Sequence, residues 1–268
     1  MTESNQKRPA FRFYGDWSGQ IVATAIHNGH DLVPEIGEAM QLDEQMRFRE
    51  EDPFTARIAE GITSGVVVDR SRFEVDLNRS REESVYRRPE DCWGLEVWRE
   101  SPLDERLVEG SLAVYDDFYA QLGERLDRLA ERGPFVLYDV HSYNHRREGP
   151  DEPDSPAEEN PEVNVGTGAL DRDLWAPVVD AFTASLEAVE TSAGRLDVRE
   201  NIRFKGGHLS RWVRSRYPET GCALALEFKK TFMDEWTGVP EDARIAELTE
   251  ALAQTTAPVL DALRKIHG

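Results

Sequence analysis

The chain has 268 residues, a length that suits one large α/β domain, and 39% of them are hydrophobic, so a complete core is expected and disorder of the whole chain is excluded. Its 32 basic and 52 acidic residues give a formal net charge of −20, which repels phosphate backbones and argues against general nucleic-acid binding. No apolar run approaches the roughly 20 residues that span a bilayer, and the N-terminal residues lack the basic start and apolar stretch of a signal peptide. We therefore expect a cytoplasmic protein that binds neither nucleic acid nor membrane.

The first half of the chain is predicted to contain two strands and a long helix. Short apolar runs rich in β-branched side chains predict buried strands at 21–26 and 65–68. A helix is expected from about 102 to 133, with Ser101 as its cap and Pro102 in its first turn. Apolar residues recur along this helix at spacings of three and four, which gives it one buried stripe.

The second half alternates strands and helices in the same way. Apolar runs at 135–140 and 223–228 predict two more strands, and helical periodicity predicts a helix at 174–189 and another in the segment after Pro240. The stretch 148–161 is rich in proline and carboxylates and has no hydrophobic face, so it is expected to be a loop. This loop is either a solvated excursion or a flap beside a functional site.

The alternation of elements predicts the fold class. Strands that alternate with helices indicate an α/β fold, with a mostly parallel central sheet and helices on both of its faces. We expect a single domain over residues 1–268. Ligands of such sheets bind beyond the carboxyl ends of the strands, so the polar residues that follow the predicted strands are the candidates for function.

Histidines gather at these predicted strand ends. His27 and His30 follow the first predicted strand, and His141 follows the third. Imidazole is the commonest protein ligand of zinc, and a catalytic zinc site needs three protein ligands and an open position. With Gly29 allowing a tight turn between them, His27 and His30 could converge on one ion together with His141. The alternative is that all three histidines are structural.

A lone carboxylate interrupts the fourth predicted strand. Glu227 stands near the end of an otherwise apolar run. A half-buried carboxylate in that place either pairs with a cation or acts as a general base. Lys229 and Lys230 are the candidate cations for a salt bridge.

An arginine-rich segment follows the second predicted strand. Asp76, Asn78 and Arg79 join an acid, an amide and a guanidinium within four residues. Arg70 and Arg72 lie just upstream. Guanidinium groups bind carboxylates in bidentate fashion, so this segment could hold an acidic substrate. Taken alone, the segment is better explained as a surface stretch that nearby glutamates neutralise.

Together these motifs resemble those of the zinc amidohydrolases and carboxypeptidases with a phosphorylase/hydrolase-like fold. Their order along the chain is HxxH, DLNR, DVHS and a strand that ends in LE. The local sequence is most similar to that of the N-formylglutamate amidohydrolase family, in the segments ATAIHNGHDLVPE, SRFEVDLNR, DVHSYNHRR, PEVNVGTG, FKGGHLSRW and ALEFKKTFMDEWTG. These segments cover roughly residues 23–238, which is most of the chain.

The resemblance implies one zinc ion per chain. His27 and His141 match the histidine ligands of the family. His30 occupies the position where the wider superfamily has a ligand glutamate, and Asp31 and Glu74 are the substitutes that the sequence offers for it.

The resemblance also implies a catalytic base and an acidic substrate. Glu227 matches the general acid/base of the family. Asn78 and Arg79 match the clamp for a substrate carboxylate, and Arg72 or Arg70 would polarise the scissile carbonyl. The expected reaction is therefore hydrolysis of N-formyl-L-glutamate to formate and glutamate.

A substrate with two carboxylates would need a second clamp. Arg146 and Arg147 have no role in the family pattern, but they follow His141 closely and could bind the second carboxylate. The sequence makes no prediction of the oligomeric state.

Two alternatives stay open from the sequence. One is a related deacylase or carboxypeptidase with a different acyl group or a peptide as substrate. The other is a regulatory protein that keeps the fold and has lost turnover, which the histidine at position 30 favours.

Overall fold

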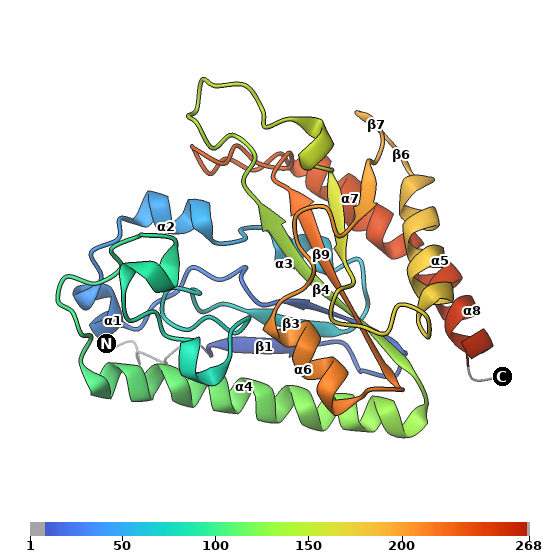
Figure 1. Cartoon of the computed structure of the whole chain (residues 1–268), viewed down its shortest axis with the longest axis horizontal. Coiled ribbons are helices and arrows are strands. Elements are labelled where there is room, and N and C mark those ends of the chain that lie inside the picture. Colours follow the sequence, from blue (N-terminus) through green and yellow to red (C-terminus); the bar gives the residue numbers. More distant parts are fainter. Residues whose placement is uncertain (1–8, 267–268) are drawn as a thin grey trace, which may run out of the picture.

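Seven strands form one mixed sheet through the centre of the molecule (Figure 1). The computed structural model describes residues 9–266. The first eight residues, part of the N-terminal stretch that was compared with a signal peptide, lie outside the described residues. In spatial order the strands are β1 (Phe11–Tyr14), β3 (Gly65–Val68), β2 (Ile21–Ala25), β4 (Phe135–Tyr143), β9 (Gly221–Lys229), β5 (Val163–Gly166) and β8 (Val198–Glu200). Four of the six neighbouring pairs are parallel, whereas β1 is antiparallel to β3 and β5 is antiparallel to β9. The predicted α/β fold with a mostly parallel sheet is confirmed.

The strand order brings the predicted functional segments side by side. β2, β4 and β9 are adjacent and parallel, so their carboxyl ends lie at the same edge of the sheet. β4 and β9 run further than the apolar runs predicted, to Tyr143 and Lys229. His141 and Glu227 therefore lie inside strands, and the register places them directly opposite each other.

Three strands of the sheet were not predicted, namely β1, β5 and β8. Each has only three or four residues, too few for a recognisable period of alternation. A separate two-stranded hairpin, β6 (Glu190–Thr191) and β7 (Gly194–Arg195), was also not predicted.

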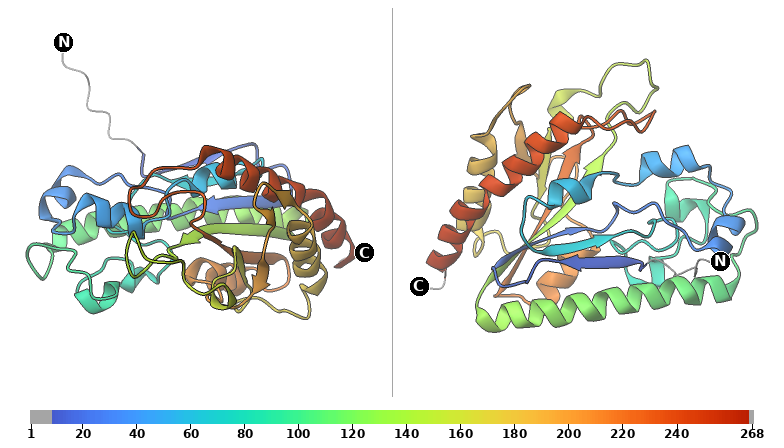
Figure 2. Two further views of the ribbon diagram at one scale, coloured as in Figure 1. Left: turned by 90° about the horizontal axis from the view of Figure 1, so that it is seen from above. Right: turned by 180° about the vertical axis from the view of Figure 1, so that it is seen from behind.

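Helices cover both faces of the sheet, as expected (Figures 1 and 2). One apolar layer forms between the sheet and two helices, α4 (Glu105–Arg132) and α6 (His208–Arg216). The other layer forms with four helices, α3 (Thr55–Ala59), α5 (Ala176–Glu187), α7 (Asp242–Gln254) and α8 (Thr256–Ile266). No helix among residues 9–266 is both long enough and apolar enough to cross a membrane.

Two helix boundaries differ from the prediction. α4 begins at Glu105, because the carboxylate of Asp104 rather than Ser101 caps it by accepting the N–H of Arg106. The C-terminal segment forms two helices, which meet at Thr255. Pro258 has no N–H with which to continue the first helix, so it stands in the first turn of the second.

The remaining elements lie beside the sheet edge that carries the strand ends. α1 (Pro34–Ala39) and the segment before α4 enclose a third apolar cluster. This segment holds two short 3₁₀ turns, η1 (Arg81–Glu83) and η2 (Pro89–Cys92), and α2 (Glu44–Glu50) precedes it. Between β4 and β5 the chain forms turns and one short 3₁₀ helix, η3 (Ala157–Glu159), within the stretch that was expected to be a loop.

Candidate active site

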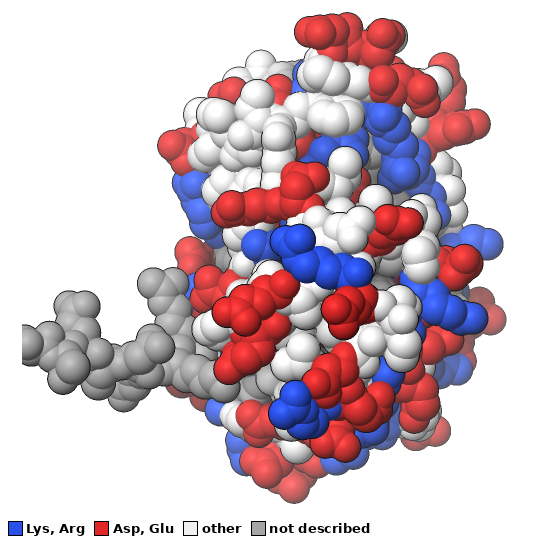
Figure 3. Space-filling view, turned by 90° about the vertical axis from the view of Figure 1, so that its left-hand side faces the viewer, with Lys and Arg blue, Asp and Glu red and all other residues white. Residues whose placement is uncertain are grey.

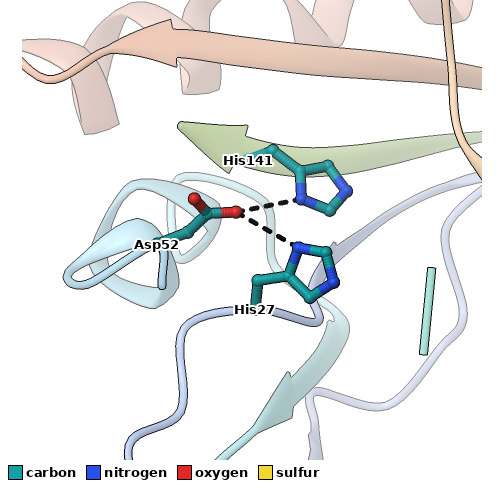
Figure 4. A group of neighbouring side chains, drawn as sticks. All are labelled: His27, Asp52 and His141. Carbon is teal, nitrogen blue, oxygen red and sulfur yellow. Dashed lines mark hydrogen bonds and ion pairs between the residues drawn. The ribbon is translucent and has the colours of Figure 1, made fainter. Parts of the chain in front are cut away.

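Three buried side chains meet where β2 and β4 end (Figure 4). His27 follows β2, His141 lies on β4, and Asp52 follows α2. Oδ2 of Asp52 lies 3.1 Å from Nδ1 of His141 and 3.4 Å from Nδ1 of His27. One ligand atom from each residue lies within 4.8 Å of the other two, a spacing that suits a single metal ion.

Asp52 is the member of this group that sequence reasoning missed. Its main-chain N–H donates to the carbonyl oxygen of His27 at 2.9 Å, which ties it to the end of β2. The Ser142 hydroxyl donates to Oδ1 at 3.0 Å, so Oδ2 is left to face the two imidazoles. In the sequence Asp52 is the last of three consecutive carboxylates, and only Pro53, which marks the end of a helix, sets it apart.

The outer nitrogens of both imidazoles contact buried carboxylates. Nε2 of His27 lies 2.7 Å from Oδ1 of Asp76, and Nε2 of His141 lies 3.1 Å from Oδ2 of Asp139. A carboxylate at Nε2 keeps the proton there and leaves the lone pair of Nδ1 facing the centre of the group. Asp139 is itself fixed by the Thr24 hydroxyl at 2.7 Å. This donor set therefore fits a metal ion that is bound by two imidazole nitrogens and one carboxylate oxygen.

The charges around the group favour a cation. Burial raises the pKa of Asp52, but hydrogen bonds to His141 and His27 outweigh it and hold that pKa well below its usual range. Burial also lowers the pKa of His141, yet the charge of Asp139 and hydrogen bonds to Asp139 and Asp52 raise it well above the ordinary value. Ionised carboxylates thus surround the imidazoles, and their negative charge would stabilise a metal cation between them.

His30, expected as the second ligand, lies outside this group. Its Nδ1 is 2.5 Å from Oε2 of Glu51, and its Nε2 is 2.9 Å from a guanidinium nitrogen of Arg47. Gly29 does not turn the two histidines toward each other. It permits a close approach of backbones, because a Cβ there would lie 2.2 Å from the carbonyl carbon of Asp69.

The two substitutes for His30 also lie elsewhere. Oε2 of Glu74 accepts the N–H of Val33 at 2.9 Å and lies 3.4 Å from the guanidinium of Arg70. Asp31 pairs through its backbone with Arg70 in an isolated parallel bridge. Neither residue belongs to the group of His27, Asp52 and His141.

The candidate ligands line a cavity of about 660 Å³, and Glu227 lines the same cavity. Burial raises the pKa of Glu227 to about 8, although the nearby charges of His141 and Arg72 oppose the shift. The salt bridge that was the alternative for Glu227 is not found among the described residues. Lys229 contacts a carbonyl oxygen instead, and Lys230 is bound by three other oxygens. Glu227 can therefore accept a proton inside the cavity.

Arg72 lines the cavity beside the candidate ligands. Its Nη2 donates to Oδ2 of Asp76 at 2.7 Å, and Asp76 also accepts hydrogen bonds from His27 and Tyr86. Burial lowers the pKa of Arg72, but the negative charge of Asp76 outweighs it and raises that pKa well above the ordinary value. Arg72 therefore places a permanent positive charge in the cavity.

Asn78 lines the cavity next to His141, and the start of α6 fixes its orientation. Oδ1 of Asn78 accepts the N–H of Leu209 at 3.1 Å, which leaves Nδ2 3.3 Å from Nε2 of His141. Gly207 makes this packing possible, because a Cβ there would lie 2.2 Å from Oδ1 of Asn78. The amide can thus present an N–H donor to the cavity.

Of the other predicted clamp residues, only Arg147 lines the cavity. Arg79 lies over the ring of Tyr86, with Cζ 4.9 Å from the centroid, and Arg146 is bound to Asp234 at 2.6 Å. Arg79 and Arg146 are not among the lining residues, so the structure does not place either of them in the expected clamp. Arg70 is likewise engaged elsewhere, with Glu74.

Comparisons with known proteins show the family of the chain. Residues 19–233 match the model of a family described as N-formylglutamate amidohydrolase, and this span includes the candidate ligands and Glu227. The N-formylglutamate deformylase of Pseudomonas aeruginosa is 31% identical over 253 residues, which cover 87% of this chain and 89% of that protein. The chain belongs to the N-formylglutamate amidohydrolase family.

Two solved structures share the fold of this chain at lower sequence identity. The N-formylglutamate amidohydrolase from Ralstonia eutropha JMP134 superposes with a TM-score of 0.72 at 15% identity, covering 96% of this chain and 99% of the other. A gene product of Agrobacterium tumefaciens gives a TM-score of 0.65 at 17% identity, covering 97% of this chain and 96% of the other. At these identities the likeness shows that this chain shares the fold of the two structures, and it does not identify individual site residues of this chain.

Proposed function

We propose that this protein is a zinc-dependent amidohydrolase that converts N-formyl-L-glutamate to formate and L-glutamate. Membership of the N-formylglutamate amidohydrolase family supports the reaction class. The observation that carries the proposal is the group of His27, Asp52 and His141 in one cavity with Glu227, since this combines a cation site with a proton acceptor. The predicted cytoplasmic location stays a prediction.

Zinc would be held by Nδ1 of His27, Nδ1 of His141 and Oδ2 of Asp52. Two imidazoles and one carboxylate form a donor set that catalytic zinc sites use, with a further position left open. When bound, the ion supplies Lewis acidity that activates water and polarises the scissile carbonyl. Asp76 and Asp139 hold the outer nitrogens of the imidazoles and so keep both rings in their ligating orientation.

Glu227 would act as the general base and then as the general acid. Its carboxylate takes the proton of the attacking water and passes it to the leaving nitrogen of the amide. A pKa raised to about 8 by burial brings this carboxylate close to the range in which it can both accept and return a proton.

Charged and polar groups of the cavity would orient the substrate. The guanidinium of Arg72 stabilises the negative charge that develops on the carbonyl oxygen. The Nδ2 group of Asn78 donates to the α-carboxylate, and Arg147 adds a positive charge at the rim of the cavity. With Asp52 as the third ligand, the histidine at position 30 no longer favours a regulatory protein without turnover.

Metal content and formate release test this proposal together. We expect about one zinc per chain in the wild type and in Glu227→Gln, and loss of zinc in His141→Ala, because only the latter removes a ligand. The kcat of Glu227→Gln on N-formyl-L-glutamate should fall on the order of 10²- to 10⁴-fold, since proton transfer is lost while the ion stays. A wild type that holds no zinc after reconstitution, or a Glu227→Gln variant with unchanged kcat, would contradict the proposal.

A further inference from the structure

Arg203 lines the cavity and has no acidic partner among the described residues. Arg49 and Arg72 also line the cavity, and each of them is bound to a carboxylate at 2.7 Å. The guanidinium of Arg203 forms no ion pair with any residue between 9 and 266, and its hydrogen bond from Nη1 goes to the neutral amide of Asn160. Because the chain has 52 acidic residues, an arginine left without a carboxylate inside a cavity points to an anionic ligand.

Two other cations of the cavity differ from Arg203 in their exposure. Arg147 and Lys205 also lack ion pairs among the described residues, but both are exposed, so water can solvate their charges. Lys230 likewise has no carboxylate partner there, but its Nζ already donates to three oxygens. Arg203 is only partly exposed, and its Nε is buried without a hydrogen-bond partner in the part of the chain that the structure describes. The Nε atoms of Arg49 and Arg72 are likewise without a partner there, but carboxylates neutralise both guanidinium groups. Of these three cavity arginines, only Arg203 leaves both an N–H group and a positive charge for a ligand to satisfy.

The guanidinium of Arg203 is held in place by its surroundings. Its Cζ lies 5.2 Å from the ring centroid of Tyr143 and 5.6 Å from that of Phe204. The fully buried Asn164 accepts the main-chain N–H of Arg203 at 2.9 Å and donates to the carbonyl oxygen of Phe204 at 2.9 Å. A cation that lies against two neighbouring rings and is anchored at its backbone loses little conformational freedom when it binds an anion.

The position of Arg203 suits the far end of an N-formylglutamate molecule. Tyr143 follows His141 by two residues on β4, a strand repeat of about 7 Å. In an extended substrate the side-chain carboxylate carbon is five bonds, or roughly 6 Å, from the formyl carbon, by standard bond lengths. The α-carboxylate carbon is only three bonds from the formyl carbon, so it belongs beside Asn78 next to the candidate ligands. The guanidinium of Arg203 lies against the ring of Tyr143, two positions beyond His141 on β4, a place that suits the side-chain carboxylate better than the α-carboxylate.

We propose that Arg203 binds the side-chain carboxylate of the substrate and thereby selects N-acyl amino acids with an acidic side chain. This inference rests on the proposed function, and it adds the residue that sets specificity. The ring of Phe204 would cover the two methylene groups that connect the side-chain carboxylate to the α-carbon.

A neutral analogue of the substrate isolates this contact. The kcat/KM for N-formyl-L-glutamate and for N-formyl-L-glutamine is measured for the wild type, Arg203→Met and Arg203→Lys. Arg203→Met should lower the value for N-formyl-L-glutamate about 100-fold and leave that for N-formyl-L-glutamine within about threefold. Arg203→Lys keeps the positive charge but loses the paired N–H donors of the guanidinium group, so it should retain part of the preference for N-formyl-L-glutamate. Arg211→Met is the matched control, because Arg211 is an exposed arginine of α6 that does not line the cavity.

Binding of the products separates this inference from the proposed function. Calorimetric titration with L-glutamate and L-glutamine should show a preference for L-glutamate in the wild type that Arg203→Met loses. If that preference is found but no substrate is hydrolysed, the proposed function fails and the carboxylate site stands. Unchanged preference in Arg203→Met overturns the assignment, as does a preference that Arg147→Met abolishes instead. If Arg203→Met does not fold, a full preference in Arg203→Lys overturns it as well.

Discussion

Asp52 lies at the end of α2, where its main-chain N–H and both carboxylate oxygens contact other parts of the site. All of these partners are distant in the sequence, so no local pattern distinguishes Asp52 from the two glutamates before it. His30, by contrast, has the spacing of a ligand but contacts Arg47 and Glu51. The role of each residue therefore follows from contacts that only the folded chain brings together.

Substitution of these two residues distinguishes their roles. Asp52→Asn keeps the shape of the side chain but removes its charge, so the affinity for zinc should fall on the order of 100-fold or more. His30→Ala should bind zinc within about threefold of the wild type, because its imidazole contacts Glu51 and Arg47 and does not line the cavity. Competition with a chromophoric chelator measures both affinities. Loss of zinc from His30→Ala with retention in Asp52→Asn would reverse the assignment.

At the level of elements, a buried lysine joins the end of α2 to the sheet. Lys230 directly follows β9 and is 1% exposed. Its Nζ donates to the carbonyl oxygens of Arg49 and Glu51 at 2.6 and 2.7 Å and to Oδ1 of Asn144 at 2.9 Å. A cation at the C-terminal end of a helix satisfies its last carbonyls and its dipole. Lys230 therefore fixes the segment from which Asp52 extends.

Removal of this lysine should loosen the site as well as the fold. Lys230→Met leaves two buried carbonyls and one amide oxygen without their donor, so the free energy of unfolding should fall by about 3 kcal/mol. Zinc affinity should fall too, since Asp52 is no longer held against His27. Urea denaturation and chelator competition measure the two effects. Lys229→Met is the matched control, because its Nζ makes one 3.3 Å contact with a carbonyl oxygen, and equal stability of the two variants would refute the argument.

The elements themselves were predictable where the sequence pattern was long. The four apolar runs correspond to the four adjacent strands that run parallel to one another, β3, β2, β4 and β9, and the buried stripe of α4 was found along its length. β5 was missed because four residues, VNVG, show no clear period, yet Asn164 on this strand holds the backbone of Arg203. Of the candidate site, six residues that line the cavity were identified from the sequence: His27, His141, Glu227, Arg72, Asn78 and Arg147. Asp52 and Arg203 were not, because long-range contacts alone mark them.

At the scale of the whole molecule, the net charge of −20 is spread over the surface. On the face shown in Figure 3, acidic side chains cover much of the surface and basic side chains lie among them in small groups. Like charges at this density repel one another and oppose the compact state. The cavity differs from this surface, because six of its lining residues are arginine or lysine: Arg49, Arg72, Arg147, Arg203, Lys205 and Lys230.

Salt should therefore stabilise the folded protein. Raising NaCl from about 0.05 M to about 0.5 M shortens the screening length and weakens the repulsion among carboxylates, so the unfolding temperature should rise by several degrees at pH 7. Differential scanning calorimetry measures the shift. The same series near pH 5, close to the sequence pI of about 4.7, should show a much smaller rise. A midpoint that falls with salt at pH 7 would mean that attractive ion pairs outweigh the net repulsion.

The pairing of His141 with Glu227 across β4 and β9 limits where residues can be inserted or deleted in the chain. The gap between a ligand and the base equals the spacing of neighbouring strands, about 4.8 Å, whatever the loops between them do. Insertions between β4 and β9, for example in the stretch 148–161, leave that gap intact. Deletion of a single residue would turn the ligand, if it falls in β4, or the base, if it falls in β9, to the opposite face of the sheet. Length variation should therefore be tolerated in the loops and excluded from these two strands.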